Sequence, residues 1–196
     1  MTPREEKKVL RAEALRRRAE RSETELARLS DALCRRIAAC DAFRECDCLL
    51  LYAAVRGEMD PTALRTLADK RGIPVGYPRT EEGGRMTYRR VPPETALRPG
   101  AYGIPAPDAL APKIRPTDRT LLLVPALMGD RAGYRLGYGG GYFDRFLMSF
   151  SGVVLGVIFA EELTDALPRE TFDLPLPAFA TQNGIFPCAS QDRPHP

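Results

Sequence analysis

The segment RLGYGGGYFDR, residues 135–145, combines residue types that suit phosphate chemistry. Three consecutive glycines, Gly139 to Gly141, expose backbone N–H groups, and N–H groups that open a helix bind phosphate oxygens. Arg135 can grip the same oxygens through two donors. Asp144, about one turn into the following helix, offers a carboxylate to a divalent cation. A tight turn followed by an acid that favours the helix dipole explains the pattern equally well, because no P-loop or Rossmann fingerprint is present.

Apolar runs alternate with helical segments along the chain. Buried strands are predicted at residues 46–54, 120–125 and 152–160. A short strand is predicted at residues 73–79, and the alternating pattern of residues 85–91 fits a further strand. Helices are predicted before and between them, beginning with residues 4–20 and a second helix that Ser22 caps. This alternation predicts an α/β fold: a three-layer sandwich with a mostly parallel central sheet and an N-terminal helical hairpin.

Candidate ligand-binding residues follow the predicted strands. In open α/β sheets, ligands bind beyond the carboxyl ends of the parallel strands. Glu58, Arg79 and the glycine-rich segment all lie in loops or strand ends at that side. We therefore expect them to line one cleft, although Glu58 taken alone also fits an acid at the start of a helix.

The composition excludes several classes of protein. The net charge of +3 is too small to imply nucleic-acid binding by itself, and no apolar run approaches the roughly 20 residues of a membrane span. The first 20 residues lack the apolar core of a signal peptide, so we predict a cytoplasmic protein. The only histidine is His195, so the five cysteines are expected to be buried free thiols rather than zinc ligands.

The segment VPALMGDRAGYRLGYGGGYFDRFL, residues 124–147, resembles the signature of the 5-formyltetrahydrofolate cyclo-ligase (methenyltetrahydrofolate synthetase) family, V-P-G-x-x-F-D-x-x-G-x-R-L-G-x-G-x-G-Y-Y-D-R. Further segments agree in order, namely KKVLR, LYAAVRGEMDP, YPR, YGIPAP and FDLPLPAFATQNGI, so the resemblance covers about residues 5–186. The departures are Ala106, Ala126, the pair Met128-Gly129, and Phe143, which removes the hydroxyl of the family's second tyrosine.

The resemblance implies an ATP- and Mg²⁺-dependent enzyme that cyclises 5-formyltetrahydrofolate to 5,10-methenyltetrahydrofolate and releases ADP and phosphate. No protein nucleophile is needed, because the formyl oxygen of the folate attacks the γ-phosphate of ATP. We expect a single domain over residues 1–188 and a disordered tail over residues 189–196. The expected partners are a reduced folate and ATP, without nucleic acid or membrane, and the protein is expected to be a monomer.

Site residues are implied by the resemblance position by position. The catalytic residues are Glu58, Arg135 and Asp144. ATP is bound by Lys7, Lys8, Arg11, Arg135, Leu136, Gly137, Tyr138, Gly139, Gly140, Gly141, Tyr142 and Phe143. The folate is bound by Ala53, Glu58, Arg79, Tyr138, Gly139, Gly140, Gly141 and Tyr142. The magnesium ligands are Asp144 and Asp173.

Alternative interpretations remain open for several of these residues. Without the resemblance, Lys7, Lys8 and Arg11 equally fit the solvated face of a charged helix, and Arg79 fits either phosphate or the glutamate tail of a folate. At the level of the whole chain, one alternative is a ligase or phosphotransferase on the same scaffold with another substrate. The other is a non-enzymatic module whose basic N-terminal helices bind an acidic partner or RNA.

Overall fold

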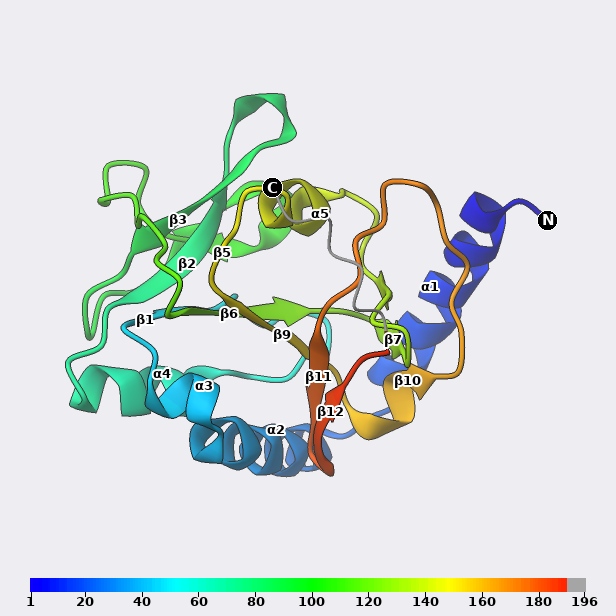
Figure 1. The fold of residues 1–196 in the computed structure, drawn as a ribbon, viewed down its shortest axis with the longest axis horizontal. Helices are drawn as coiled ribbons and strands as arrows, with labels where there is room; N and C mark the ends of the chain where they lie inside the picture. Colours follow the sequence, from blue (N-terminus) through cyan, green and yellow to red (C-terminus); the bar gives the residue numbers. More distant parts are fainter. Residues whose placement is uncertain (190–196) are drawn as a thin grey trace.

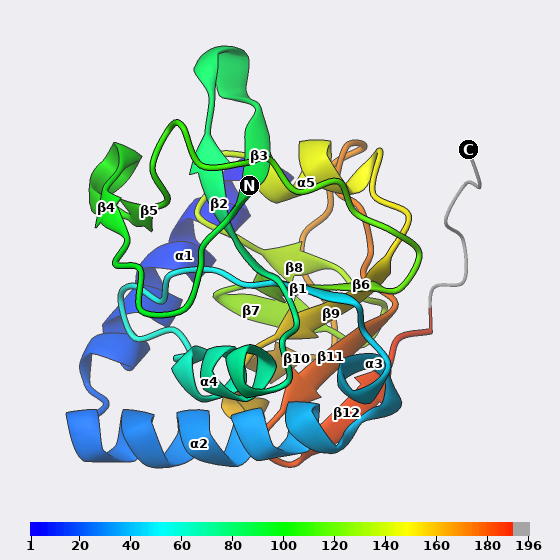
Figure 2. The same ribbon diagram turned by 90° about the vertical axis from the view of Figure 1, so that its left-hand side faces the viewer.

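The computed structural model describes residues 1–189, so nearly all of the tail predicted at 189–196 lies outside the described residues. Figures 1 and 2 show helices packed around a central sheet. The α-helices are α1 (Pro3–Ala19), α2 (Glu23–Ala39), α3 (Asp41–Arg44), α4 (Thr62–Lys70) and α5 (Tyr142–Leu147). Short 3₁₀ helices are η1 (Glu82–Gly84), η2 (Ala101–Gly103) and η3 (Ala160–Glu162).

Among the described residues, seven strands form the main sheet in the order β12-β11-β9-β6-β1-β2-β3. Their bounds are β1 (Cys48–Leu50), β2 (Val75–Thr80), β3 (Met86–Arg90), β6 (Thr120–Pro125), β9 (Val153–Val157), β11 (Ala178–Thr181) and β12 (Gly184–Pro187). The inner pairs β1/β2, β1/β6, β6/β9 and β9/β11 are parallel, whereas the edge strands β3 and β12 run antiparallel to their neighbours. The mostly parallel sheet of the predicted fold class is therefore confirmed.

Short strands lie outside the main sheet. They are β4 (Arg98–Pro99), β5 (Pro105–Ala106), β7 (Met128–Asp130), β8 (Arg135–Leu136) and β10 (Leu163–Thr164). β7 and β8 are antiparallel and fold the loop after β6 back on itself, so the glycines follow directly from this short hairpin. β4 and β5 form a separate hairpin that projects from the body of the molecule in Figure 2.

Both faces of the sheet are covered at its centre, which explains why the central strands β1, β6 and β9 are almost entirely apolar. Leu49 and Leu121 pack with Leu33 of α2 on one face, whereas Leu50 and Leu122 point to the opposite face. Successive side chains of a strand point to opposite faces, so a strand buried on both faces needs an unbroken apolar run.

The two N-terminal helices lie in different parts of the molecule. α2 lies under the sheet with α4, whereas α1 stands beside it, at the end toward which β6 points (Figure 1). The buried residues of α1 are Lys7, Ala14 and Arg18. Their spacing places them on one stripe of the helix, so α1 turns a basic face toward the loops at the carboxyl ends of the strands.

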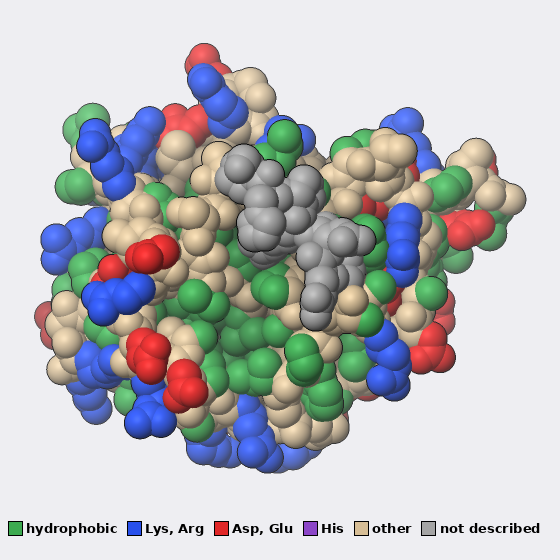
Figure 3. Space-filling view, in the orientation of Figure 1, with side chains coloured by type: hydrophobic (Ala, Val, Ile, Leu, Met, Phe, Trp, Pro, Cys, Tyr) green, Lys and Arg blue, Asp and Glu red, His purple; other side chains and the backbone are tan. Residues whose placement is uncertain are grey.

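The surface carries mixed charge. On the face shown in Figure 3, Lys and Arg side chains are interspersed with Asp and Glu side chains. Several exposed arginines of the N-terminal helices pair within their own helix, as Arg35 does with Asp31 and Arg16 does with Glu20. Such pairing gives no support to the alternative in which these helices bind RNA. Across residues 1–189, no helix combines the length and the apolar composition needed to cross a bilayer.

Candidate active site

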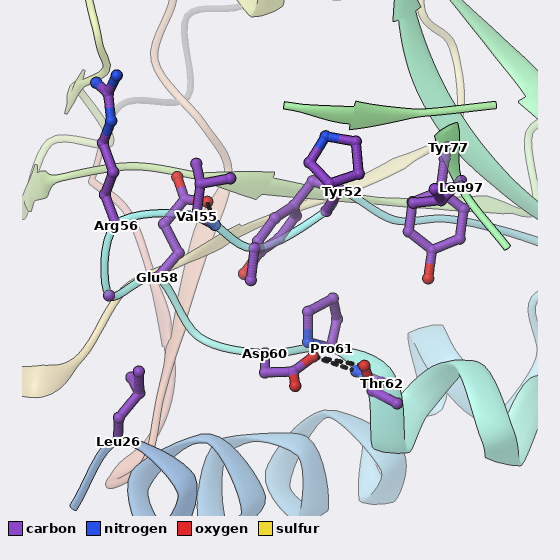
Figure 4. Close-up of a pocket in the computed structure, with 14 residues that line it drawn as sticks. Leu26, Tyr52, Val55, Arg56, Glu58, Asp60, Pro61, Thr62, Tyr77 and Leu97 are labelled. Carbon is purple, nitrogen blue, oxygen red and sulfur yellow. Dashed lines mark hydrogen bonds between the residues drawn. The ribbon is translucent and has the colours of Figure 1, made fainter. Parts of the chain in front are cut away.

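A pocket of about 400 Å³ lies where β1 and β2 end. Figure 4 shows the rings of Tyr52 and Tyr77 at its upper side, facing Pro61 and Thr62 at the start of α4. We call it the Glu58 pocket; its lining residues are Leu26, Tyr52, Ala53, Ala54, Val55, Arg56, Gly57, Glu58, Asp60, Pro61, Thr62, Tyr77, Leu97 and Pro105. The apolar walls with one buried acid suit a flat, partly aromatic ligand with a few polar groups.

Glu58 is held by a tight turn after β1. Arg56 and Gly57 both have positive φ, 50° and 75°, and the carboxylate of Glu58 accepts the N–H of Val55 at 3.0 Å. The residue is only 5% exposed. Burial raises the pKa of Glu58 to about 7, against the opposing effects of the Val55 N–H and the Arg18 guanidinium. Near neutral pH this acid can therefore accept or donate a proton.

Tyr138 connects the glycine-rich loop to the Glu58 pocket. Its side chain lies near enough to Glu58 to lower the pKa of the acid, against the larger effect of burial, which raises it. Burial raises the pKa of Tyr138 itself, so its hydroxyl stays protonated and can donate. The Arg56 guanidinium lies 5.3 Å from the centre of the Tyr138 ring. The loop and the pocket therefore belong to one site.

The glycine-rich loop adopts a backbone that side chains rarely allow. Gly139 and Gly141 have φ of 96° and 64°, in the left-handed region. Arg11 of α1 donates from Nε to the Gly137 carbonyl oxygen at 2.8 Å, and its guanidinium lies against Gly139. α1 therefore supports the loop from one side.

A second group of side chains, which we call the charged cluster, consists of Lys7, Arg135, Asp144, Glu170 and Asp173. Lys7 Nζ lies 2.5 Å from Asp173 and 2.8 Å from Glu170, and Arg135 lies 2.7 Å from Asp144. Burial lowers the pKa of Arg135 although Asp144 opposes it, whereas the two carboxylates raise the pKa of Lys7 in spite of its burial. α1, the start of α5 and residues 170–174 thus meet at a site with buried charge of both signs.

The carboxylates of the charged cluster are of the kind that could hold a magnesium ion. Mg²⁺ in proteins is usually held by one or two carboxylates together with substrate phosphates and water. Leu174, the residue after Asp173, donates its N–H to Asp144 at 3.4 Å and accepts from Arg135 through its carbonyl oxygen, so the two predicted ligands lie in one cluster. Within residues 1–189, no group of three or more His, Cys, Asp or Glu side chains is arranged to hold a metal on its own.

Other predicted residues lie at different distances from these two centres. Ala53 lines the Glu58 pocket. Arg79 lies near the end of β2 and donates to the Pro107 carbonyl oxygen at 2.8 Å, without lining that pocket. Lys8 is exposed, on the side of α1 away from Lys7.

The two aromatic residues after the glycines, Tyr142 and Phe143, have different surroundings. The Tyr142 hydroxyl lies 3.0 Å from that of Tyr102 on the β4–β5 hairpin, so this hairpin reaches the glycine-rich loop. Phe143 is half-buried and packs against the hydrophobic core on the α5 side of the sheet. Its missing hydroxyl is thus replaced by an apolar contact.

Three charged residues at the site were not predicted. Glu170 pairs with Lys7, while Arg18 and Glu162 form a buried ion pair next to the Glu58 turn. Arg18 follows Lys7 by eleven residues and Arg11 by seven. This helical spacing is the one signal that could have placed Arg18 on the same face.

A family model described as the 5-formyltetrahydrofolate cyclo-ligase family matches residues 3–182. A curated 5-formyltetrahydrofolate cyclo-ligase from Haemophilus influenzae is 28% identical over 141 residues, which cover 68% of this chain and 74% of the relative. The relative from Escherichia coli K12 has the same name and is 27% identical over 144 residues, 69% of this chain and 78% of its own.

Solved structures agree with this match. The 5,10-methenyltetrahydrofolate synthetase of Aquifex aeolicus superposes with a TM-score of 0.83 at 29% identity and covers 97% of this chain and 96% of its own. The synthetase of Mycoplasma pneumoniae has a TM-score of 0.72 at 20% identity, covering 90% of this chain and 98% of its own. At that identity, the second structure supports the fold alone.

Proposed function

Because the chain belongs to the 5-formyltetrahydrofolate cyclo-ligase family, we propose that it catalyses the ATP- and Mg²⁺-dependent cyclisation of 5-formyltetrahydrofolate to 5,10-methenyltetrahydrofolate, with release of ADP and phosphate. The observation that carries this proposal is the connection, through Tyr138 and α1, between a pocket with a buried acid and a glycine-rich loop flanked by buried charges. A folate and a nucleotide can then be held with their reacting groups facing each other. Residues 1–188 would act as one domain.

In this proposal the Glu58 pocket binds the pterin of the folate. The rings of Tyr52 and Tyr77 and the start of α4 provide the apolar walls. Glu58 accepts hydrogen bonds from the pterin or orients N10, and its burial strengthens these bonds. Tyr138 donates its hydroxyl at the boundary between the folate and the nucleotide.

The glycine-rich loop and the charged cluster bind the triphosphate. Gly137 and Gly139 leave the backbone open, since a Cβ at Gly137 would meet nothing within 4 Å and one at Gly139 would meet only Arg11. Lys7, Arg11 and Arg135 supply positive charge from two sides. These cations lie against Asp173, the loop carbonyl and Asp144, so they are held in place without a nucleotide.

Asp144 and Asp173 would hold Mg²⁺, which when bound neutralises the phosphate oxygens as charge develops on them. Once the carboxylates are engaged, Lys7 and Arg135 are free to turn their donors to the γ-phosphate. We therefore propose that the ion pairs of the charged cluster exchange partners when the nucleotide binds.

The chemistry requires alignment and charge stabilisation rather than a protein nucleophile. The formyl oxygen on N5 attacks the γ-phosphorus and displaces ADP, so that the oxygen becomes part of a phosphate leaving group. N10 then attacks the formyl carbon and gives up its proton, and loss of inorganic phosphate leaves the methenyl bridge between N5 and N10. Arg135 and Lys7 stabilise the charge on the transferred group, while Glu58 keeps N10 directed at the carbon.

The direct test is an assay of the purified protein with 5-formyltetrahydrofolate, ATP and Mg²⁺. We expect the near-ultraviolet absorbance of the methenyl amidinium to grow, with ADP and phosphate formed in equal amounts to the product. ATP binding without methenyl product would indicate a ligase or phosphotransferase with another substrate. Neither ATP binding nor product formation would indicate a binding module, and either outcome would overturn the proposal.

Gly139→Ala is expected to weaken ATP binding about tenfold or more, because the φ of 96° is unfavourable for alanine and the added methyl group would lie against the guanidinium of Arg11, a proposed phosphate ligand. The measurement is a calorimetric titration with ATP. Gly83→Ala is the matched control, since Gly83 also has positive φ (72°) and open space around it but lies on the β2–β3 hairpin. Both variants should lose about 1–2 kcal/mol of unfolding free energy. Equal ATP affinity in the two variants would mean that Gly139 serves the turn alone.

A further inference from the structure

Arg18 packs directly beneath the turn that carries Glu58. A Cβ added to Gly57 would lie 3.2 Å from Arg18 Cβ and 3.5 Å from the Arg18 carbonyl oxygen. Gly57 also has a φ of 75°. The positive φ and the tight contact with Arg18 Cβ both favour glycine at this position, so α1 packs against the turn at Arg18.

The guanidinium of Arg18 is held in one orientation by three hydrogen bonds. Nε and Nη2 donate to the two carboxylate oxygens of Glu162 at 2.7 and 2.8 Å, and Nη2 also donates to the Ala126 carbonyl oxygen at 2.6 Å. Glu162 is itself fixed, because its Oε2 accepts the N–H of Phe159 at 3.0 Å. Arg18 and Glu162 are 5% and 8% exposed, so this is a buried, two-pronged ion pair.

The remaining nitrogen of Arg18, Nη1, is buried and has no hydrogen-bond partner among the described protein groups. Buried polar groups without a partner are rare and costly, and a buried ion pair adds little net stability. A hydrophobic pair of similar size would fill the same space. The use of a guanidinium here therefore calls for a reason other than packing.

We propose that Arg18, held by Glu162, is a positioning residue for Glu58: it fixes the turn from below and sets the charge against which the Glu58 carboxylate ionises. This inference rests on the proposed function insofar as it concerns folate turnover. Its effect on the ionisation of Glu58 can be measured without any turnover.

Several charged or titratable groups surround Glu58. They are Arg18 of α1, Glu162 of η3, Tyr138 of the glycine-rich loop, Tyr52 after β1, and Arg56 and Asp60 of the same loop. Arg18 lowers the pKa of Glu58 and Glu162 raises it. The two members of the ion pair therefore have opposite effects on Glu58. Removing the charge of Arg18 should raise the pKa of Glu58, and removing the charge of Glu162 should lower it.

The experiment is a carboxyl carbon-13 NMR titration of Glu58, assigned by its loss in Glu58→Gln, in the full-length wild-type protein and four variants. In Arg18→Met the midpoint is expected to rise by about one pH unit or more, and in Glu162→Gln to fall by a similar amount. The double variant Arg18→Met/Glu162→Gln should titrate close to the wild type. Arg16→Met is the matched control, because Arg16 lies on the exposed side of α1, and it should leave the midpoint unchanged.

A merely structural role for Arg18 would give a different pattern. Midpoints that stay constant, or that move in the same direction in both single variants, would overturn the proposal. Where Arg18→Met does not fold, the comparison of Glu162→Gln with the double variant isolates the Arg18 charge, and an unchanged midpoint between those two would also overturn it.

The acidic limb of the pH profile of kcat/KM for 5-formyltetrahydrofolate provides the second measurement. It should move with the NMR midpoint, upward in Arg18→Met and downward in Glu162→Gln. A wild-type protein that shows the NMR shifts but forms no methenyl product would refute the proposed function and leave the role of Arg18 intact. If the enzyme turns over the folate but the acidic limb of the kcat/KM profile stays at the same pH in both variants, the role of Arg18 in catalysis is refuted and the proposed function remains intact.

Discussion

Asp144→Asn is expected to lower ATP-dependent turnover by at least about 100-fold while the protein stays folded. Asparagine retains an oxygen that can accept from Arg135 and from the Leu174 N–H, which now lie 2.7 and 3.4 Å from the Asp144 carboxylate. The variant loses the negative charge, so its amide oxygen binds a divalent cation much more weakly than the carboxylate does. The cost to folding should stay within about 1–3 kcal/mol, the worth of a hydrogen bond to a charged group.

The measurement is turnover as a function of Mg²⁺ concentration, together with urea unfolding of both proteins. We expect Asp144→Asn to need far more Mg²⁺ for half-maximal turnover than the wild type and to reach a lower maximal rate. Asp165→Asn is a suitable control, because Asp165 pairs with Arg131 at 95% exposure of its side chain and lies outside the charged cluster. Near-normal turnover of Asp144→Asn at limiting Mg²⁺ would reject Asp144 as a metal ligand.

Much of the central sheet was predictable because the segments of several strands carry a local signal. The run TLLLVP predicts a strand at 120–125, and β6 has these same bounds. The run at 46–54 is also apolar, but only Cys48–Leu50 forms β1. Leu51 and Tyr52 remain buried in the core after the chain has left the sheet, so their hydrophobicity reports burial rather than strand pairing.

The hairpin of β11 and β12 was not predicted, although β11 pairs with the parallel part of the sheet. Its segments contain four residues each, and Pro177 and Pro187 lie at its ends. Proline and short length both reduce the strand signal in a sequence. What forms these strands is the sheet edge offered by β9, which is a tertiary feature.

The candidate site also contains residues that the sequence could identify and residues that it could not. Its signature residues share one continuous segment, so Arg135 and Asp144 could be identified from the sequence. Arg18 stands in the run Arg16-Arg17-Arg18, where its neighbours pair with Glu20 and Glu13 on the helix surface. The partner of Arg18 is 144 residues away, and only the folded chain brings it near. Buried ion pairs between distant segments leave no local pattern.

Glu58→Gln is expected to abolish most of the turnover and, at the same time, to stabilise the protein above neutral pH. A positioned acid or base contributes about 10²- to 10⁴-fold to a rate, so we expect turnover to fall at least 100-fold. ATP affinity should remain unchanged, because the glycine-rich loop and the charged cluster keep all their groups. A calorimetric titration with ATP and the methenyl assay measure the two effects separately.

The effect on stability follows from the burial of the carboxyl group. Burial raises the pKa of Glu58 from its ordinary value of 4.5 to about 7, so the folded state holds the proton more tightly than the unfolded state. Its contribution to stability is fully present below pH 4.5 and is lost as the pH rises through 7. At about 1.4 kcal/mol for each pH unit, the ionised acid costs the wild type on the order of 3 kcal/mol at pH 8.

Glutamine has no charge to bury, so the unfolding free energy of Glu58→Gln should exceed that of the wild type at pH 8 and approach it at pH 4.5. Urea unfolding at both pH values tests this, with Glu82→Gln on the exposed β2–β3 turn as the control that should show no such pH dependence. Equal stability of Glu58→Gln and the wild type at pH 8 would mean that the buried, ionised carboxylate does not destabilise the folded protein. A less stable variant that keeps its turnover would assign Glu58 to the fold rather than to the reaction. The expected combination, greater stability with lost turnover, would mark Glu58 as a residue whose burial serves the chemistry at a cost to the fold.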